Sequence, residues 1–275
     1  MAIDIMSAFR VKPPPLDFVF GGLVAGTVAC IAAAGSTGKS FLALQLAMCV
    51  ASAEADKALL KLGIKNHGKV VILNAEDPEI VVLQRLHSIG LLLSEDARME
   101  VAERVVIEPL VGKGVDIMKK EWFEAVLRIT DDARLAIFDT FSRWHRKKEN
   151  DNGEMAGVVG QFERLSATTG AASLYLHHVS KGMAMDGRQD EQQATRGAAA
   201  ITDNCRWQGY MQKMTVEEAK TFGVDELQRK DFVSWGGNKE NYGQASNVSW
   251  LRRHEGGVLL PTTFENTNTK KKAWK

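Results

Sequence analysis

Four short apolar runs, each closed by a polar residue, recur along the chain at 28–32, 70–73, 135–138 and 172–176. Between them, apolar residues recur at helical spacing, as in Leu42, Leu46 and Val50, or Ile80, Leu83 and Ile89. Alternation of buried strands with amphipathic helices is typical of a doubly wound α/β domain with a mainly parallel sheet. In such domains ligands bind beyond the carboxyl ends of the strands, so the polar residues that end each run become the candidates for chemistry.

Composition narrows the class of protein. With 275 residues and 45% hydrophobic content, the chain is long enough for one large domain. A formal net charge of +1 with 25% charged residues gives no global field for nucleic acid, so any such contact needs a local basic patch. The three cysteines lack metal-ligand spacing and are expected to be reduced and structural. No stretch approaches the roughly 20 apolar residues that span a bilayer, and we expect a soluble, cytoplasmic protein.

We divide the chain into a segment at 1–15, a domain at 16–262 and a basic tail at 263–275. The first segment carries apolar Ile5, Met6 and Phe9 before three consecutive prolines, which form a stiff joint. So short a helix is unstable alone. It either docks, on its own domain or on a neighbouring subunit, or frays. The tail is expected to be disordered, with weak nucleic-acid contact as the alternative.

A nearly complete phosphate-binding loop (P-loop), AAGSTGKS at 33–40, lies between the first strand and the helix expected at 41–52. Its glycines let successive N–H groups and the helix N-terminus point at one polyphosphate, so a nucleoside triphosphate such as ATP is the expected ligand. Lys39 would reach the β- and γ-phosphates and Ser40 would ligate Mg²⁺. The strict pattern begins with glycine, whereas this chain has Ala33. A glycine-containing corner without ligand is the alternative. The nucleotide-binding set is Gly35, Ser36, Thr37, Gly38, Lys39 and Ser40.

Acidic residues follow the second and third strands. Glu76 stands where a carboxylate could accept a proton from the water that attacks a γ-phosphate; the alternative is an acid in the first helical turn. Asp77 is expected to cap the following helix. Asp139 closes the third run in the manner of a Walker-B acid, whose carboxylate holds the Mg²⁺ shell.

The fourth strand runs into His177 and His178. Adjacent side chains on an extended strand face opposite ways, so at most one histidine is expected to touch the γ-phosphate. A metal site is the alternative, but no third ligand stands in register.

Taken together, these motifs resemble the RecA-fold hexameric helicases, and most closely the small plasmid-encoded replicative helicases of the RepA type. The resemblance extends from about residue 13 to 261 and preserves the order of motifs. It is carried by AGTV at 25–28, ALQLA at 43–47, AEDP at 75–78, LHHVSKG at 176–182, DNCRWQ at 203–208 and KENYG at 239–243.

This resemblance implies a RecA-like P-loop NTPase core with a C-terminal antiparallel strand extension. It implies a homohexameric ring that hydrolyses ATP between subunits and moves on single-stranded DNA, 5′ to 3′, during plasmid replication. By motif, Glu76 would be the catalytic base, Asp139 the Walker-B acid and His178 the γ-phosphate sensor. Lys39 would serve catalysis as well as binding, and Arg85 could add a charge near the nucleotide or be a solvated helix residue.

The resemblance also suggests a cation acting on the neighbouring subunit's site. Arg206 would be this arginine finger, and Lys239 is its competitor. Related helicases carry an arginine two residues after that lysine; the residue here is Asn241, which favours Arg206. Alternatively, Arg206 might only pair with Asp203 or stack on Trp207.

In a ring of this class, the loops after the Walker-B and sensor strands face the channel. The first reads SRWHRKK at 142–148, a basic cluster with one aromatic, as single-strand binding requires. A solvated surface is the alternative. The candidate DNA contacts are Arg143, Arg146, Lys147, Lys148, Lys181 and Arg188.

Two other functions share these motifs: a RecA-like DNA-dependent ATPase that acts as recombinase or regulator without unwinding, and a non-catalytic nucleotide-gated scaffold. No primase, zinc or helix-hairpin-helix module is added to the core. Under the helicase hypothesis, a primase and an origin-binding initiator are therefore expected as partners in trans.

Overall fold

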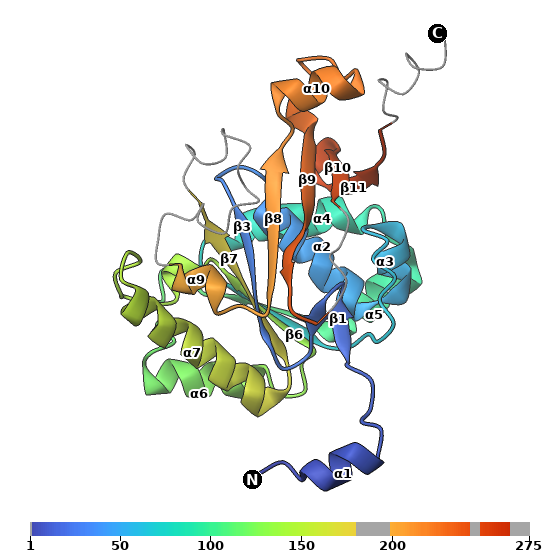
Figure 1. Cartoon of the computed structure of the whole chain (residues 1–275). Coiled ribbons are helices and arrows are strands. Elements are labelled where there is room, and N and C mark those ends of the chain that lie inside the picture. Colours follow the sequence, from blue (N-terminus) through green and yellow to red (C-terminus); the bar gives the residue numbers. More distant parts are fainter. Residues whose placement is uncertain (1, 180–198, 243–247, 265–275) are drawn as a thin grey trace.

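The computed structural model describes residues 2–179, 199–242 and 248–264. Their centre is a nine-stranded sheet in the order β11-β10-β9-β8-β3-β7-β6-β4-β5 (Figure 1). Its strands are β3 (Val28–Ala33), β4 (Val70–Asn74), β5 (Val105–Pro109), β6 (Leu135–Asp139), β7 (Ala172–His178), β8 (Trp207–Lys213), β9 (Phe232–Glu240), β10 (Ser249–Arg253) and β11 (Leu259–Thr262).

The six strands from β5 to β8 pair in parallel, whereas β9, β10 and β11 pair antiparallel. This arrangement confirms the predicted α/β class, with its mainly parallel sheet and C-terminal antiparallel extension. All four predicted strands are present and each runs one or two residues further than predicted. Sequence reasoning missed β5, because this edge strand is only partly buried and lacks a continuous apolar run.

Helices cover both faces of the sheet, and each face has its own core. The residues of β3 alternate between them: Ala29 and Ile31 belong to one core, Val28 and Cys30 to the other. Both faces are therefore buried, which explains the continuous apolar run. The helices of the body are α2 (Lys39–Ala51), α3 (Ala53–Ala58), α4 (Glu79–Gly90), α5 (Glu95–Arg104), α6 (Lys120–Ile129), α7 (Asn152–Thr169) and α9 (Ala200–Asp203).

The three cysteines are free and buried, as predicted for reduced structural residues. Within the described ranges, none of the helices has the length and apolarity needed to cross a bilayer.

The extension has a small core of its own. Beyond the parallel sheet, β8 and β9 continue into α10 (Val216–Phe222), which stands at the top of Figure 1. A capping box between Thr215 and Glu218 starts this helix. Buried Met214 and Phe232 pack with Trp250 and Phe264, so the extension is a folded unit beside the carboxyl edge of the sheet.

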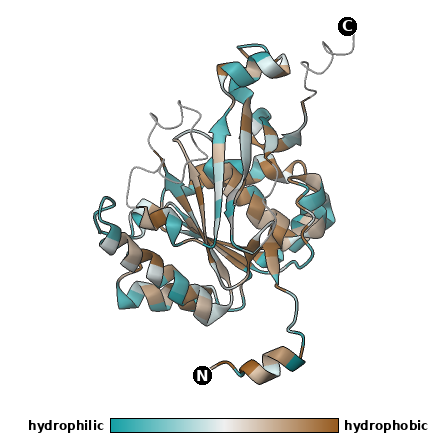
Figure 2. Ribbon diagram, in the orientation of Figure 1, coloured by the Kyte–Doolittle hydropathy of each residue, from teal (hydrophilic) through white to brown (hydrophobic). Residues whose placement is uncertain are grey.

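The N-terminal segment stands apart from the body (Figures 1 and 2). Helix α1 (Ile5–Arg10) is capped by Asp4, whose carboxylate accepts the Ser7 N–H at 3.1 Å. Phe9 is 77% exposed, and the helix has no buried residue. The hairpin of β1 (Phe18–Phe20) and β2 (Leu23–Val24) follows the proline linker. The division at 15 and 262 stays a prediction.

Candidate nucleotide-binding site

The P-loop connects the carboxyl end of β3 to the start of α2. Gly38 caps α2 with a φ of 111°, and Ser36 has a φ of 60°. Ala33, in contrast, is still part of the extended strand β3, and its side chain is buried in one of the cores. Because a strand residue needs no positive φ, alanine fits where the strict motif has glycine. The unexplained residue of the motif thus has a physical reason: its methyl group adds to the core.

Lys39 lies in the cleft beside this loop. Its ammonium Nζ donates to the carbonyls of Ala33 at 2.8 Å and Ala34 at 3.3 Å, and contacts His178 Nδ1 at 3.1 Å. Burial lowers the pKa of Lys39 to about 8, although nearby Glu76 and Asp139 oppose this effect. The site therefore holds a partly desolvated cation, which a polyphosphate would stabilise.

His178 connects Lys39 to Glu76. Its Nε2 lies 3.2 and 3.3 Å from the two carboxylate oxygens of Glu76. An ammonium group can only donate, so Nδ1 must accept from Lys39 and Nε2 carries the proton that Glu76 accepts. This hydrogen bond is the main reason why the pKa of Glu76 lies below its usual value.

The two histidines do face opposite ways. His177 is 2% exposed, and burial lowers its pKa to about 4. His178 reaches the cleft instead, so the structure brings together the histidine, the lysine and the glutamate that the motifs indicated. Among the described residues, no cluster of metal ligands includes either histidine, which removes the observation that a metal site at this pair would need.

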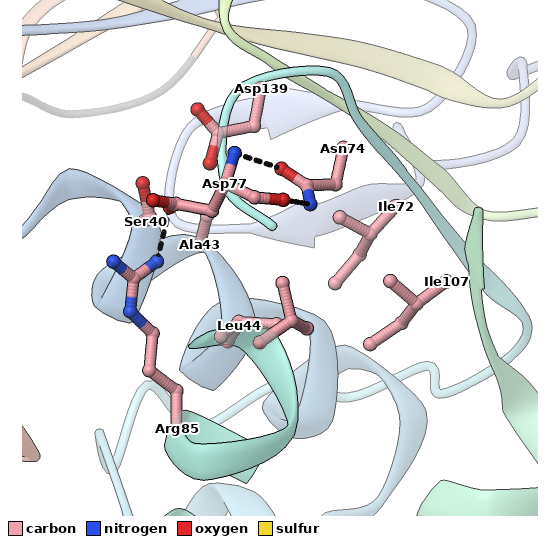
Figure 3. Close-up of a pocket in the computed structure, with 10 residues that line it drawn as sticks. Ser40, Ala43, Leu44, Ile72, Asn74, Asp77, Arg85, Ile107 and Asp139 are labelled. Atoms are coloured by element: carbon pink, nitrogen blue, oxygen red, sulfur yellow. Dashed lines mark hydrogen bonds and ion pairs between the residues drawn. The ribbon is translucent and has the colours of Figure 1, made fainter. Parts of the chain in front are cut away.

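Asp139 ends β6 and faces Ser40, in the first turn of α2 (Figure 3). Burial raises the pKa of Asp139 to about 6, the Ser40 hydroxyl opposes this rise, and the charges of Glu76 and Asp77 add to it. A hydroxyl and a carboxylate are the hard oxygen donors that Mg²⁺ prefers. The pair therefore fits the predicted metal site.

The interpretation of Asp77 as a helix cap is wrong. Pro78 occupies the cap position of α4 and makes no side-chain cap. The carboxylate of Asp77 instead pairs with Arg85 Nη1 at 2.5 Å, as Figure 3 shows. Asn74 Oδ1 accepts the Asp77 N–H at 3.2 Å, so the turn after β4 is stabilised by a side chain of the strand itself.

Arg85 faces the cleft rather than bulk solvent. It lies over the Phe41 ring at 5.4 Å and lines the same cavity as the P-loop. This cleft has a volume of about 400 Å³. Its lining residues are Ser36, Thr37, Gly38, Lys39, Ser40, Phe41, Glu76, Asp77, Arg85, His178 and Arg253.

Sequence reasoning missed Arg253. It is the last residue of β10, and its Nη2 donates to the Thr37 carbonyl of the P-loop at 2.8 Å. The only sequence signal was the pair Arg252-Arg253 in an alternating strand, and it does not say which arginine faces the nucleotide cleft.

Arg206 and Lys239 lie together, far from the P-loop of their own subunit. The Arg206 N–H donates to the Val28 carbonyl at 2.9 Å, at the start of β3. The loop begins after Ala33, so five residues at about 3.3 Å each separate the two by roughly 16 Å. Lys239 pairs with Gln208 in the sheet, and its Nζ donates to the Asp203 carbonyl at 2.6 Å. The side chain of Arg206 is exposed.

The basic loop after β6 is only partly as predicted. Arg143, Arg146, Lys147 and Lys148 are exposed, but Trp144 is fully buried. The Trp144 ring packs edge-on against Phe138 at 5.0 Å. It cannot stack on a base without leaving the core, because its face already belongs to that core. Lys181 and Arg188 lie outside the described residues.

The fold and this cleft define a P-loop ATPase of the RecA-like class. A DnaB-like replicative helicase, whose structure is described together with its interactions with primase, is similar, with a TM-score of 0.61 at 14% identity over 94% of this chain and 67% of that chain. Another solved structure, a separate ATPase domain, gives 0.58 at 16% over 86% and 85%. The RadB recombinase gives 0.54 at 13% over 87% and 91%. At these identities the likeness establishes the fold.

The chain belongs to the AAA domain family, whose model matches residues 3–184. The matched region contains the P-loop, Glu76, Asp139 and His178. Membership of this family and the geometry of the cleft together imply nucleotide binding.

Proposed function

We propose that this protein is an ATP-dependent DNA helicase that works as a homohexameric ring on single-stranded DNA. The observation that carries the proposal is the separation of its catalytic groups. Lys39, Glu76 and His178 share the cleft, whereas Arg206 and Lys239 lie at the opposite end of the strands. A second copy must supply these cations if they are to act on ATP, and a closed ring gives every subunit such a neighbour.

Within one subunit, hydrolysis depends on the link between Lys39, His178 and Glu76. Arrival of a γ-phosphate offers Lys39 an anionic partner in place of the Ala33 carbonyl and the His178 ring. His178 Nδ1 is then free of the ammonium, while its Nε2 proton still orients the Glu76 carboxylate. Glu76, ionised at neutral pH, accepts a proton from the attacking water. Loss of the γ-phosphate reverses this exchange and changes the position of the end of β7.

Ser40 and Asp139 would hold Mg²⁺, which when bound neutralises charge on the transferred phosphoryl group. In the metal-free site the Asp139 carboxyl is destabilised as an anion by burial. A divalent cation beside it offsets that cost, so we expect the metal and the ionised form of Asp139 to stabilise each other.

Arg206 acts in trans as the arginine finger in this proposal. It is exposed at the start of β8, with Lys239 beside it on β9. Such a finger contributes about 10³-fold or more to turnover. Lys239 already donates to a backbone carbonyl of its own subunit, which favours Arg206 for the role.

Helix α1 supports a multimeric state. Its apolar residues are exposed in their own subunit, and the three-proline joint holds them away from the body. We propose that α1 docks on the neighbouring copy. Truncation before Pro13 should therefore convert rings to monomers in native mass measurements, and rings of unchanged mass would refute the docking.

Single-stranded DNA would pass along Arg143, Arg146, Lys147 and Lys148. These exposed cations neutralise phosphates, so DNA affinity should fall as salt rises. Lys181 and Arg188 are proposed to join them from the loop after β7. Buried Trp144 leaves this group without an aromatic platform, so we expect electrostatic, sequence-independent contact.

A plasmid replicative helicase of the RepA type is the finer proposal, and it rests on the motif resemblance along 13–261. With 5′ to 3′ movement, such a helicase would work with a primase and an origin-binding initiator in trans.

The second candidate is a DNA-dependent ATPase that acts as a recombinase or regulator. The similarity of the fold to the RadB recombinase favours it, because both functions use the same core. Filaments, or turnover without strand separation, would distinguish it. A nucleotide-gated scaffold would retain its activity in the variant Glu76→Gln.

One experiment separates these functions. Fork unwinding and single-strand-stimulated ATPase are measured for the wild type, Lys39→Ala and Arg206→Ala, with native mass measurement of each. We expect a hexamer that unwinds DNA, and two inactive variants. In mixed rings, Arg206→Ala subunits should silence their wild-type neighbours; if those neighbours keep full turnover, Arg206 does not act in trans. A monomer with DNA-independent ATPase would refute the helicase function.

A further inference from the structure

Arg253 brings an additional cation to the phosphate-binding loop from a distant part of the chain. Its guanidinium donates from Nη2 to the Thr37 carbonyl and lines the nucleotide cleft. A carbonyl uses only one of its N–H donors, and an arginine carries several in a fixed planar fork that matches phosphate oxygens. The remaining donors are therefore available on the side of the cleft.

The guanidinium packs directly on Gly38. A Cβ atom at this position would lie 3.1 Å from Nη2 and 3.4 Å from Nη1 of Arg253. Glycine is thus required at 38 for two reasons, the φ of 111° and the closeness of this side chain. The P-loop and β10 are fitted to one another at the point where α2 begins.

This is an unfavourable place for a cation alone. Helix α2 begins at Lys39, and a helix N-terminus carries partial positive charge from its free N–H groups. A guanidinium and an ammonium placed beside it repel both the helix end and one another. An anion bound among the three would turn each repulsion into an attraction, and a polyphosphate is the anion that a P-loop binds.

The other cations of the cleft already have partners. Arg85 is paired with Asp77, and Lys39 is held by two carbonyls and a histidine. Arg253 is half-buried, and burial lowers its pKa. Asp231 attracts it from a distance, but among the described residues Arg253 forms no ion pair.

Its position is held by a separate pair of hydrogen bonds. Arg253 pairs with Leu259 across β10 and β11. Buried Gln45, on the P-loop helix, donates to the Leu259 carbonyl at 2.7 Å and accepts the Leu259 N–H at 3.0 Å. The antiparallel extension is therefore fastened to α2, and Arg253 is set against the P-loop by rigid elements.

We propose that Arg253 is a cis ligand of the nucleotide polyphosphate, so that the extension completes the phosphate site within one subunit. This inference deepens the proposed nucleotide site and rests on it. It gives the β10–β11 extension a role in binding: displacement of the extension would withdraw a phosphate ligand.

The test is equilibrium binding to the full chain, with ADP and inorganic tripolyphosphate each competing against a fluorescent ADP analogue. Arg253→Gln should weaken both competitors about tenfold or more, because a charged hydrogen bond to phosphate is lost. Arg253→Lys should fall between this variant and the wild type. Arg252→Gln is the matched control: its side chain is exposed and lies over Phe232 at 5.6 Å, so both affinities should stay unchanged.

Several results would overturn the inference. One is ADP affinity of Arg253→Gln within threefold of the wild type. Another is weaker ADP binding with unchanged tripolyphosphate binding, which would place the contact at the nucleoside. Gln45→Leu loosens the extension and keeps the guanidinium, so an equal loss in that variant would assign the effect to the fastening alone. Wild type that binds neither competitor would refute the nucleotide site itself, whereas wild type and Arg253→Gln binding equally would refute only the role of Arg253.

Discussion

Substitution of Asp139 should stabilise the metal-free protein at neutral pH while it abolishes hydrolysis. Burial raises the pKa of this carboxyl from 3.8 to about 6, with help from the charges of Glu76 and Asp77. A difference of that size corresponds to about 3 kcal/mol by which ionisation is disfavoured in the folded state. Asp139→Asn removes the charge and keeps the shape.

The sign follows from proton linkage. Between pH 3.8 and about 6 the folded protein binds more protons at this site than the unfolded chain, so stability falls as pH rises through this range. Below it, wild type and Asp139→Asn both carry a neutral side chain and should be about equally stable. Above it, the variant should be more stable by about 3 kcal/mol, or ~6–12 °C in melting temperature for a domain of this size.

Thermal unfolding at pH 5 and pH 8 in the presence of a chelator would measure this difference. Asp77→Asn is the matched control, because it breaks the partly exposed pair with Arg85 and should destabilise by at most about 1 kcal/mol. Added Mg²⁺ with ADP should raise the melting temperature of the wild type more than that of Asp139→Asn. The reasoning is refuted if Asp139→Asn is less stable than the wild type at pH 8, or if their difference does not depend on pH.

Three further predictions concern single residues. Glu76→Gln should lower the ATPase kcat by about 10²–10⁴-fold with ADP affinity retained, and a rate near that of the wild type would remove Glu76 from catalysis. His178→Ala removes the hydrogen bond that lowers the pKa of Glu76, so the acid limb of residual ATPase activity should move to higher pH; an unmoved limb would separate the two residues. Trp144→Ala should cost about 3–5 kcal/mol in urea unfolding, because the side chain is fully buried. If stability is unchanged and only DNA affinity falls, Trp144 contacts DNA after all.

The phosphate-binding loop and the acids at the strand ends were predictable because they depend on local order. A strand followed by a glycine-rich turn and a helix places Lys39 and Ser40 at a helix start whatever the rest of the fold does. Parallel strands bring their carboxyl ends to one edge, so Glu76, Asp139 and His178 could be expected to lie near each other.

Other features depend on contacts between distant parts of the chain. Asp77 had the sequence context of a helix cap, yet its carboxylate pairs with Arg85 two turns along α4. Trp144 had the context of a DNA-binding aromatic, yet it fills the core beside Phe138. In both cases local pattern leaves two partners open, and packing selects the one that buries more surface or neutralises a charge.

By itself, the sequence determined the α/β class, the nucleotide loop and the residues that end each strand, because periodicity and short motifs act over a few residues. Only the tertiary structure decided that Ala33 needs no glycine conformation, that His178 rather than His177 reaches Lys39, and that Arg253 stands against Gly38. These facts arise from the register of strands far apart in the chain. Hydrophobic pattern records which face of a strand is buried, but it does not record which strand lies beside it.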